Sequence, residues 1–414
     1  MLALAAVAAL AMAATAPAAL AQGPVDAKAA VDEPPAAASA RVTLARPAYR
    51  ISPRALPKTA AEARAVLERR LRSAGRGSVR RTDIRYVLRL ADRYLRRGQP
   101  PGRLRTVERT LQVNAWWFGR RGSPAQRVVV RDPDGILSTY WEGRGFAVNP
   151  VATAGRWHGL NAELAAEELA EALLPLGVGR RGVGRRFLLW EYYDVPDRPA
   201  TIRPGASGMA QGRVAQLLAR AYYRTGDPRY ATAARGALSA FTVPVGRGGA
   251  MSLVSARAGG PTMPWYVERA YPGESPWRGA ALNGFMVTLL NLRSAAATLS
   301  ARPRPLAIGP AGERARERAP GAVRAGALAR SLADRGARTL ARYLPIHDTG
   351  DWSLYGLLTP GYPWRGFVAD LNYHCYHVRL LRQLHAGWPV HRFGRTAERW
   401  AGYVRARGLS CPKG

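Results

Sequence analysis

Lysine is almost absent from this 414-residue chain, because only Lys28, Lys58 and Lys413 are found among its 62 basic residues. Acidic residues number 28, so the formal net charge of +34 is carried by arginine. A basic surface attracts polyanions, and charge alone leaves nucleic acid, anionic lipid and acidic polysaccharide open as partners. Guanidinium groups pair carboxylates and sulfates through parallel hydrogen bonds, so this surface suits uronic-acid polymers as well as phosphates.

Long apolar runs are also missing, with one exception at the start of the chain. No later stretch approaches 18 uninterrupted apolar residues, which predicts no transmembrane helix and no stable membrane insertion. Residues 1–19 form an Ala/Leu run, and Ala19-Leu20-Ala21 before Gln22 is a cleavage site of the A-x-A type. We therefore expect residues 1–21 to be a signal peptide and the protein to be secreted or extracytoplasmic. Export also argues against a nucleic-acid partner.

Cysteine is scarce, with Cys375 and Cys411 as the two in the chain. In an oxidising compartment the two could pair and tie the C-terminal tail to the helix that carries Cys375, although two buried or free thiols remain the alternative. His374 and His377 are spaced i, i+3 but lack a third ligand at suitable spacing. We therefore expect no metal site and no cofactor.

The first part of the chain contains a segment of linker-like composition followed by a segment with helical periodicity. Residues 22–57 are rich in Ala, Pro and Val without a sustained period, which predicts a disordered linker, with order beginning near Lys58. Residues 61–110 then show apolar residues at helical spacing and predict two or three amphipathic helices with basic outer faces. These helices, together with a β-hairpin, are predicted to occupy residues 58–160.

The β-hairpin is expected at residues 128–148, where β-branched and aromatic runs flank the turn sequence Asp132-Pro133-Asp134-Gly135. Gly143 and Gly145 could let a ligand approach the backbone, but a strand bulge is the commoner reason for such glycines. Further along, residues 177–186 predict a Gly/Arg-rich loop. That loop is not a phosphate cradle, because a Walker-type Gly-Lys-Ser/Thr is absent.

Helical hairpins organise residues 161–410. Residues 207–241 contain two helical patterns broken at Thr225-Gly226-Asp227-Pro228, which is typical of an αα-hairpin. A second pair is predicted at 280–299 and 322–343, and a third at 373–385 and 390–407. Such pairs close as a solenoid or as an (α/α) toroid. Because no fixed repeat period is visible, we predict a mainly α fold with an (α/α) toroid and a small N-terminal β-hairpin.

Titratable side chains converge between Leu344 and Leu384. Tyr355, Tyr373, His374 and His377 lie where a loop meets the start of a predicted helix with Asn372 as its N-cap. Loop residues held by a scaffold are typical of active sites. A Tyr/His/Leu helix face is also typical of packed core, and the segment alone does not decide between the two.

Six ordered blocks in this part of the chain resemble one known family. They are Ser207-Gly-Met-Ala-Gln-Gly212, the following segment 220–230, Tyr271-Pro272, Leu282-Asn283-Gly284-Phe285, residues 344–355, and Tyr373-His374-x-x-His377. Together they resemble the C-terminal domain of the glucuronyl C5-epimerases, which convert D-glucuronate to L-iduronate in heparosan and heparan-type chains. The resemblance implies an (α/α) toroid, an isomerase activity and an acidic polysaccharide substrate. A homodimer is one possible assembly.

The resemblance also implies catalytic residues. Three family tyrosines correspond to Tyr271, Tyr355 and Tyr373, whereas the glutamate before the first is Ala270 here and the aspartate after the second is Gly356. Glu268, three residues before Tyr271, is the substitute that the sequence offers for the missing glutamate. The same reaction type is therefore expected, on this or a related uronate polymer.

Proton exchange at carbon 5 of a uronate needs a base on one face, an acid on the other, and cations or hydrogen-bond donors at the carboxylate. Tyrosine can serve as acid or base if its pKa of about 10 is lowered by neighbouring arginines or imidazolium groups. The expected substrate-binding residues are Arg203, Gln211, Asn283, Arg365, His374 and His377. The arginines could equally be solvated surface charges, and the amides could be helix caps.

Two other classes of function compete with the epimerase. A polysaccharide lyase shares the first proton abstraction, and a glycoside hydrolase would need a pair of carboxylates, which no spacing in this sequence marks. A non-catalytic binder of acidic glycans is favoured by the altered Glu and Asp positions. Reaction products distinguish these classes.

Overall fold

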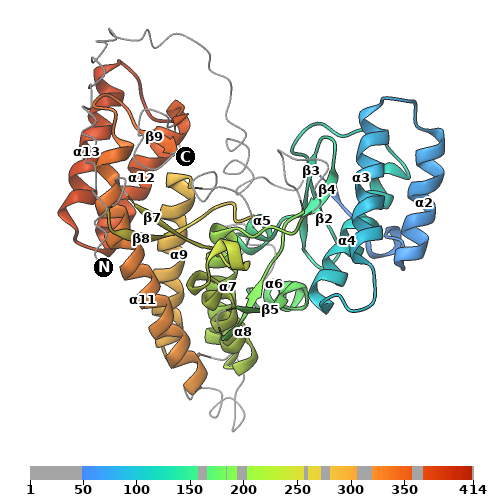
Figure 1. The fold of residues 1–414 in the computed structure, drawn as a ribbon, viewed down its shortest axis with the longest axis horizontal. Coiled ribbons are helices and arrows are strands. Elements are labelled where there is room, and N and C mark those ends of the chain that lie inside the picture. The colour runs from blue at the N-terminus through green and yellow to red at the C-terminus, as the bar shows by residue number, and fades with distance from the viewer. Residues whose placement is uncertain are drawn as a thin grey trace, which may run out of the picture. The chain divides into compact units, whose positions relative to one another are not determined.

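The computed structural model describes residues 49–156, 166–182, 184–193, 203–255, 260–271, 280–304, 319–356 and 367–412. Helices dominate these residues, and four small sheets accompany them (Figure 1). The mainly α class is therefore confirmed, whereas closure of the helical pairs into a toroid stays a prediction. The expected signal peptide, most of the linker, Arg365 and most of the 301–320 loop lie outside the described residues.

Three helices form the N-terminal helical part: α2 (Ala60–Ser73), α3 (Val79–Tyr94) and α4 (Pro101–Phe118). Side-chain caps start the first two, because Thr59 accepts a hydrogen bond from the Glu62 amide and Ser78 from the Arg81 amide. The described chain begins earlier than Lys58, with strand β1 (Tyr49–Arg50) and a 3₁₀ turn (Pro53–Ala55). The buried Ile51 side chain anchors this segment, so the linker ends sooner than the composition predicted.

The N-terminal sheet has four strands in the order β1-β2-β3-β4. β1 pairs in parallel with β2 (Val129–Arg131), whereas β3 (Leu137–Trp141) is antiparallel to both of its neighbours, β2 and β4 (Gly145–Val148). The predicted Asp132 turn is confirmed, since its carboxylate accepts hydrogen bonds from the Asp134 and Ile136 amides. The prediction was a single β-hairpin, whereas the structure has a third antiparallel strand, β4, paired with β3. Gly145 is explained by packing rather than a ligand, because a Cβ there would lie 2.3 Å from Asn114 Oδ1.

Two short elements, α5 (Pro150–Ala154) and α6 (Ala166–Leu173), lead to the ribbon β5 (Val178–Gly182) and β6 (Arg185–Leu189). A 3₁₀ turn at Leu174–Leu176 separates α6 from the ribbon. The prediction of a loop at 177–186 is therefore wrong. Arginine and glycine dominate these ten residues, so the alternation of apolar and polar side chains that marks a strand is weak in the sequence. In the structure Val178 and, directly after the ten residues, Phe187 are buried.

The predicted αα-hairpin is confirmed as α7 (Gly208–Thr225) and α8 (Pro228–Ser239). Gly226 ends α7 with a left-handed φ of 73°, and Asp227 and Pro228 start α8 as N-cap and first residue. Helix α9 (Leu282–Ser300) packs between α7 and α11 (Pro320–Tyr343), as Figure 1 shows. Because α9 is covered on both sides, it is apolar nearly all round.

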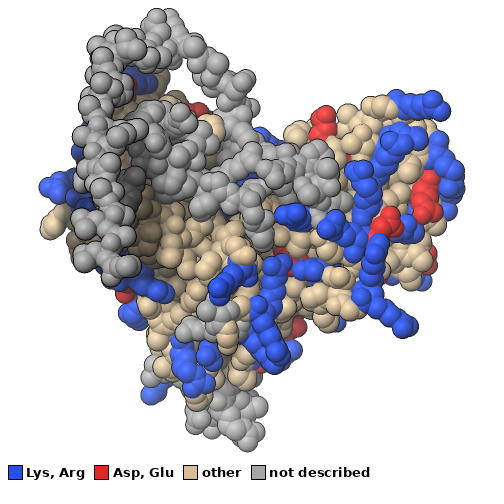
Figure 2. All heavy atoms as spheres, in the orientation of Figure 1, with Lys and Arg blue, Asp and Glu red and all other residues tan. Residues whose placement is uncertain are grey.

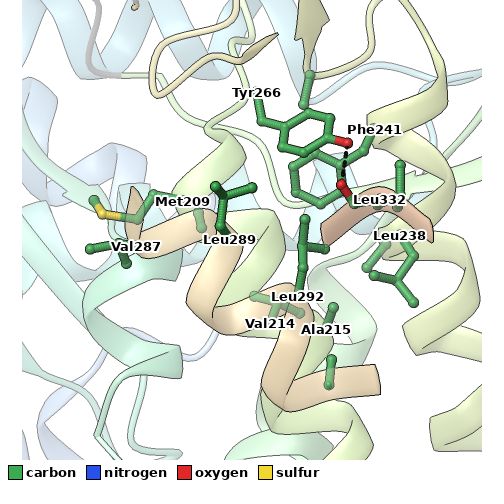
Figure 3. Close-up of a cluster of buried hydrophobic side chains, with 14 of the residues drawn as sticks. Met209, Val214, Ala215, Leu238, Phe241, Tyr266, Val287, Leu289, Leu292 and Leu332 are labelled. Carbon is green, nitrogen blue, oxygen red and sulfur yellow. Dashed lines mark hydrogen bonds between the residues drawn. The ribbon is translucent and has the colours of Figure 1, made fainter. Parts of the chain in front are cut away.

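The core of this part joins α7, α9 and α11 to a second ribbon, β7 (Met251–Ser255) and β8 (Thr262–Tyr266). Short 3₁₀ turns at Ala240–Thr242 and Val245–Arg247 precede the ribbon. Figure 3 shows the buried side chains meeting around Tyr266, whose hydroxyl donates a 2.8 Å hydrogen bond to the Leu332 carbonyl. That bond satisfies the one polar atom that Tyr266 brings into the core.

The C-terminal part contains a 3₁₀ turn (Leu344–His347), the strands β9 (Leu354–Gly356) and β10 (Phe367–Val368), and the helices α12 (Leu371–Gly387) and α13 (His391–Ala406). A Cys375–Cys411 disulfide ties the tail to the first turns of α12, which is the pairing left open by the sequence.

In the part of the chain described, no helix has the length and apolarity needed to cross a membrane.

Removing this disulfide should destabilise the fold without abolishing it. The bridge closes a separation of 36 residues, and the chain-entropy relation gives about 4 kcal/mol for a loop of that size. We therefore expect Cys375→Ala with Cys411→Ala to lower the free energy of unfolding by up to about 4 kcal/mol in guanidinium titrations. Two titratable thiols in denatured, unreduced wild-type protein would contradict the pairing.

Candidate active site

Tyr355 and Tyr373 form the centre of the candidate site. Tyr355 lies on β9, and Tyr373 lies in the first turn of α12, with their ring centroids 4.7 Å apart at 71°. The N-cap of α12 is Asp370, whose carboxylate accepts from the Tyr373 amide at 2.8 Å, so the prediction of Asn372 as the cap is wrong. The two phenols are therefore held in contact by a strand and a capped helix start.

Glu268 lies beside this pair on the segment that follows β8. Its carboxylate fills the space above Gly284 at the start of α9, because a Cβ at Gly284 would lie 2.6 Å from Glu268 Oε2. The next residue back, Asn283, is fully buried. Four of the residues expected from sequence, namely Glu268, Asn283, Tyr355 and Tyr373, thus come together from separate elements.

Tyr355 is held in its neutral form by these surroundings. Burial raises its pKa well above the usual value, and the nearby Glu268 carboxylate and Tyr373 phenol raise it further. Arg269 and the Asn283 amide lower that pKa, but by less than burial raises it. The expectation of a depressed tyrosine pKa is wrong for Tyr355, whose phenol stays protonated and can donate a hydrogen bond but is not available as a base.

Tyr271 is placed by a different contact. Its ring lies against the backbone of Gly205, where a Cβ would approach Tyr271 Cε1 to 1.9 Å. The neighbouring Ala206 and Ala270 exchange backbone hydrogen bonds of 2.9 and 2.8 Å, which fixes the two segments side by side. Arg203, two residues before Gly205, is exposed, as expected of either a substrate ligand or a solvated charge.

The two histidines of the Tyr-His-x-x-His motif serve the fold. His374 Nδ1 accepts from the Ser353 amide at 3.2 Å, so its proton lies on Nε2, which donates to the Trp400 carbonyl at 2.9 Å. His377 Nδ1 lies 3.0 Å from Ser353 Oγ. Both side chains are fully buried, and burial lowers the pKa of each. These contacts favour a structural role over the expected role as substrate ligands, because burial keeps both rings neutral and neither supplies an imidazolium charge.

Gln211 is also corrected from substrate ligand to structural residue. Its side chain is fully buried in α7, accepts from the Trp190 amide at 2.9 Å and donates to the Leu188 carbonyl at 2.8 Å. Those bonds fix the end of β6 to α7, so no donor or acceptor of the amide is directed at a sugar hydroxyl.

Arg213 is a candidate ligand that the sequence analysis did not single out. Burial lowers the pKa of its guanidinium, which lies near the Tyr376 and Tyr192 phenols. Tyr376 in turn lies near enough to Glu268 for that carboxylate to raise its pKa, although burial is the larger cause. Within the described part of the chain, Arg213 makes a long hydrogen bond to the Val151 carbonyl at 3.5 Å and no ion pair. A half-buried guanidinium without a carboxylate partner among the described residues is suited to a substrate carboxylate.

A sequence signal for Arg213 exists. It is the one charged residue between Gly208 and Ala219, a stretch in which every other side chain is buried. An unpaired charge among buried side chains costs free energy, so its presence in this stretch points to a role beyond stability. Composition does not identify this position, because the chain has 62 basic residues and most arginines are expected to be solvated.

Acid should destabilise the protein through the histidines beneath the site. His347 is fully buried, and burial lowers its pKa to about 4, against about 6.5 when unfolded. A depressed folded-state pKa means that the stability is present above pH 6.5 and is lost as the pH falls toward 4. The loss from His347 alone is about 3 kcal/mol, and His377 shifts in the same direction.

Urea titrations between pH 7 and pH 4.5 would measure this loss. His347→Asn should be less stable at pH 7 but should show a shallower decline with acid, because the variant has one proton fewer to bind on unfolding. An unchanged slope in that variant would show that other groups govern acid unfolding.

The comparisons with known proteins bear on the family of the chain. The sequence model of the family described as D-glucuronyl C5-epimerase C-terminus matches residues 190–402, which include every site residue named above. The D-glucuronyl C5-epimerase of Caenorhabditis elegans is 29% identical over 211 residues, 51% of this chain and 30% of that protein. The match therefore spans less than a third of the relative's length.

The described residues contain no group of three or more His, Cys, Asp or Glu arranged to hold a metal ion.

Proposed function

Because the chain belongs to the D-glucuronyl C5-epimerase C-terminal family, we propose that it inverts carbon 5 of D-glucuronate to L-iduronate in an acidic, heparosan-like polysaccharide. The observation that carries this proposal is the meeting of Glu268, Tyr355 and Tyr373 inside the matched region. Proton donors and a carboxylate in one buried cluster are what exchange at an acidic carbon requires.

The reaction breaks the C5–H bond and passes its electron pair into the adjacent carboxylate, giving an enediolate. A second proton then forms a new C5–H bond on the opposite face, so no atom is gained or lost. Donors and cations at the carboxylate oxygens stabilise the charge that develops there. Arg213 fits this role because it is half-buried and forms no ion pair within the described residues, and the exposed Arg203 is a further candidate.

The Tyr355–Tyr373 contact limits how the sugar can bind. A sugar ring between two groups needs van der Waals contact on both sides, a separation of roughly 7 Å. The tyrosine rings are 4.7 Å apart, so the sugar cannot lie between them. In our proposal this pair faces one side of the sugar, with Tyr373 exchanging the proton and Tyr355 behind it as a neutral donor. Tyr271 meets the opposite face.

Glu268 has a supporting part in this proposal. Its carboxylate lies near both Tyr355 and Tyr376 and can hold their hydroxyl protons in place. Among the described residues, the other deeply buried glutamate is Glu191, which pairs with Arg103 and Arg180 and accepts from the Tyr193 hydroxyl. A hydrolase would need a second available carboxylate, so Glu191 does not favour that alternative.

We also propose that the protein acts outside the cytoplasm. The N-terminal Ala/Leu run and its A-x-A site support export, and the Cys375–Cys411 disulfide is typical of oxidising compartments. N-terminal sequencing of secreted protein tests this part, with a start near Gln22 as the expected result.

The reaction class is tested by product analysis. Unsulfated heparosan incubated with the protein should contain L-iduronate signals in its proton NMR spectrum. A new 4,5-unsaturated chromophore would indicate a lyase, and new reducing ends without unsaturation would indicate a hydrolase. Binding without any of these products would indicate a glycan-binding protein.

A further inference from the structure

An open groove lies between the β5–β6 ribbon and helix α8, with Leu328 of α11 at its margin. Its volume is ≈ 1470 Å³. The lining comes from the ribbon, from one face of α8 and from Leu174, and it contains none of the tyrosines of the candidate active site. This ribbon–α8 groove is therefore a separate feature of the surface.

Arginine dominates the charge of the groove. Five arginines line it, and no Asp or Glu is among the lining residues: Arg180, Arg181, Arg186, Arg229 and Arg235. Figure 2 shows arginine side chains gathered over the region where Figure 1 places β5 and α8. A concave surface of one sign concentrates oppositely charged ligands.

Two of these arginines are neutralised and three are not. Arg180 pairs with Glu191, and Arg229 pairs with Asp227 and Glu171 at 2.8 and 3.1 Å. Arg181, Arg186 and Arg235 are exposed and form no ion pair within the described residues. Three positive charges that have no ion-pair partner in the described part of the chain therefore line the groove.

Two of these three arginines lie where their charges destabilise the β5–β6 ribbon. Arg181 on β5 and Arg186 on β6 are directly opposite in the register of the ribbon. Side chains in such positions share a face with their Cβ atoms about 5 Å apart, and like charges there repel. Across the groove, Thr232, Arg235 and Ser239 follow one face of α8 at helical spacing. The ribbon and the helix thus direct guanidinium and hydroxyl donors into one space.

We propose that the ribbon–α8 groove is a second binding site for acidic polysaccharide, holding a stretch of the polymer away from the reacting uronate. The choice of a uronate polymer rests on the proposed function. Guanidinium groups bind its carboxylates, the Thr232 and Ser239 hydroxyls suit sugar hydroxyls, and the apolar margin at Leu188 and Leu328 suits sugar rings.

The groove is poorly suited to nucleic acid. Single-stranded nucleic acids bind by stacking their bases on accessible aromatic side chains. Phe187 is the aromatic residue of the lining, and its side chain is 2% exposed. Without a stacking surface, the groove offers charge and hydroxyl contacts that match a polysaccharide better.

A second site would make affinity depend on chain length. A polymer long enough to reach both sites gains from the effective concentration of its second segment, whereas a short oligosaccharide does not. Long chains should therefore bind more tightly than short ones by at least an order of magnitude. That advantage should shrink as salt screens the groove.

The test compares two triple variants of the full-length protein. Arg181→Gln, Arg186→Gln and Arg235→Gln remove the uncompensated charges of the groove. Arg330→Gln, Arg395→Gln and Arg405→Gln remove the same charge from exposed positions outside its lining. Binding of long unsulfated heparosan, a short heparosan oligosaccharide and single-stranded DNA is measured by calorimetry at low and high salt.

We expect the groove variant to lose about 10-fold or more of its long-chain affinity and to keep its affinity for the oligosaccharide. Equal losses in both variants would overturn the proposal in favour of diffuse charge attraction. A loss confined to DNA would overturn it in favour of a nucleic-acid site. These are binding measurements, so failure of the epimerase proposal would appear separately, as wild-type protein that binds heparosan without changing it.

Discussion

Phenylalanine at position 373 is expected to lower proton exchange at carbon 5 by about 10²-fold or more, the usual effect of losing a general acid or base. The substitution removes one hydroxyl and leaves the ring, so the 4.7 Å contact with Tyr355 and the Asp370 cap of α12 are preserved. Polymer affinity should change little, because the lost interaction acts on the transferred proton. The measurement is turnover on unsulfated heparosan alongside its dissociation constant.

Tyr403→Phe is the matched control for this substitution. Tyr403 lies on α13, and its hydroxyl donates to Asp348 at 3.1 Å, so the same atom is removed outside the cluster. Exchange should stay near the wild-type rate. If Tyr373→Phe retains near-normal exchange while Glu268→Gln abolishes it, the tyrosine assignment is wrong and the carboxylate is the base.

An alanine at Gly284 should also lower turnover by up to about 10²-fold, because displacements near 1 Å in an active site can have effects of that size. The added methyl group would lie 2.6 Å from Glu268 Oε2 and 2.9 Å from its Cβ, so the whole side chain must shift. Tyr355 and Asn283 would then lose their present relation to the carboxylate. Alanine itself favours helix, so α9 should persist.

Gly321→Ala is the control for backbone and helix effects. Gly321 lies in the first turn of α11, and a Cβ there meets no atom within 4 Å. Circular dichroism should show folded protein for both variants, with activity lost in Gly284→Ala alone. Full activity in Gly284→Ala would show that the position of Glu268 has no bearing on the reaction.

The helical framework could be predicted from the sequence because its signals are local. The Thr225-Gly226-Asp227-Pro228 break carries both a C-terminal and an N-terminal helix signal, and the structure places the helix ends there. The β5–β6 ribbon could not be predicted in the same way. Its strands are stabilised by packing on α8, where a Cβ at Gly236 would lie 2.8 Å from Leu188 Cγ, and such contacts are not local in sequence.

The candidate site was predicted in part. The motifs identified Glu268, Asn283, Tyr355 and Tyr373, which the structure brings together. They could not separate catalytic from structural polar groups, because His374 becomes structural only through Ser353 and Trp400, which are 21 and 26 residues away. Arg213 was missed because its sequence position does not show that it has no ion-pair partner among the residues that the structure describes.

Exchange in deuterated water tests the central claim most directly. A heparosan chain incubated with wild-type protein should acquire deuterium at carbon 5 of its uronates, with part of them inverted to iduronate, and Tyr373→Phe should slow both changes together. Proton and deuterium NMR would follow the label and the inversion in one sample. Glucuronate that retains its C5 proton after prolonged incubation with folded protein that binds it would contradict the account.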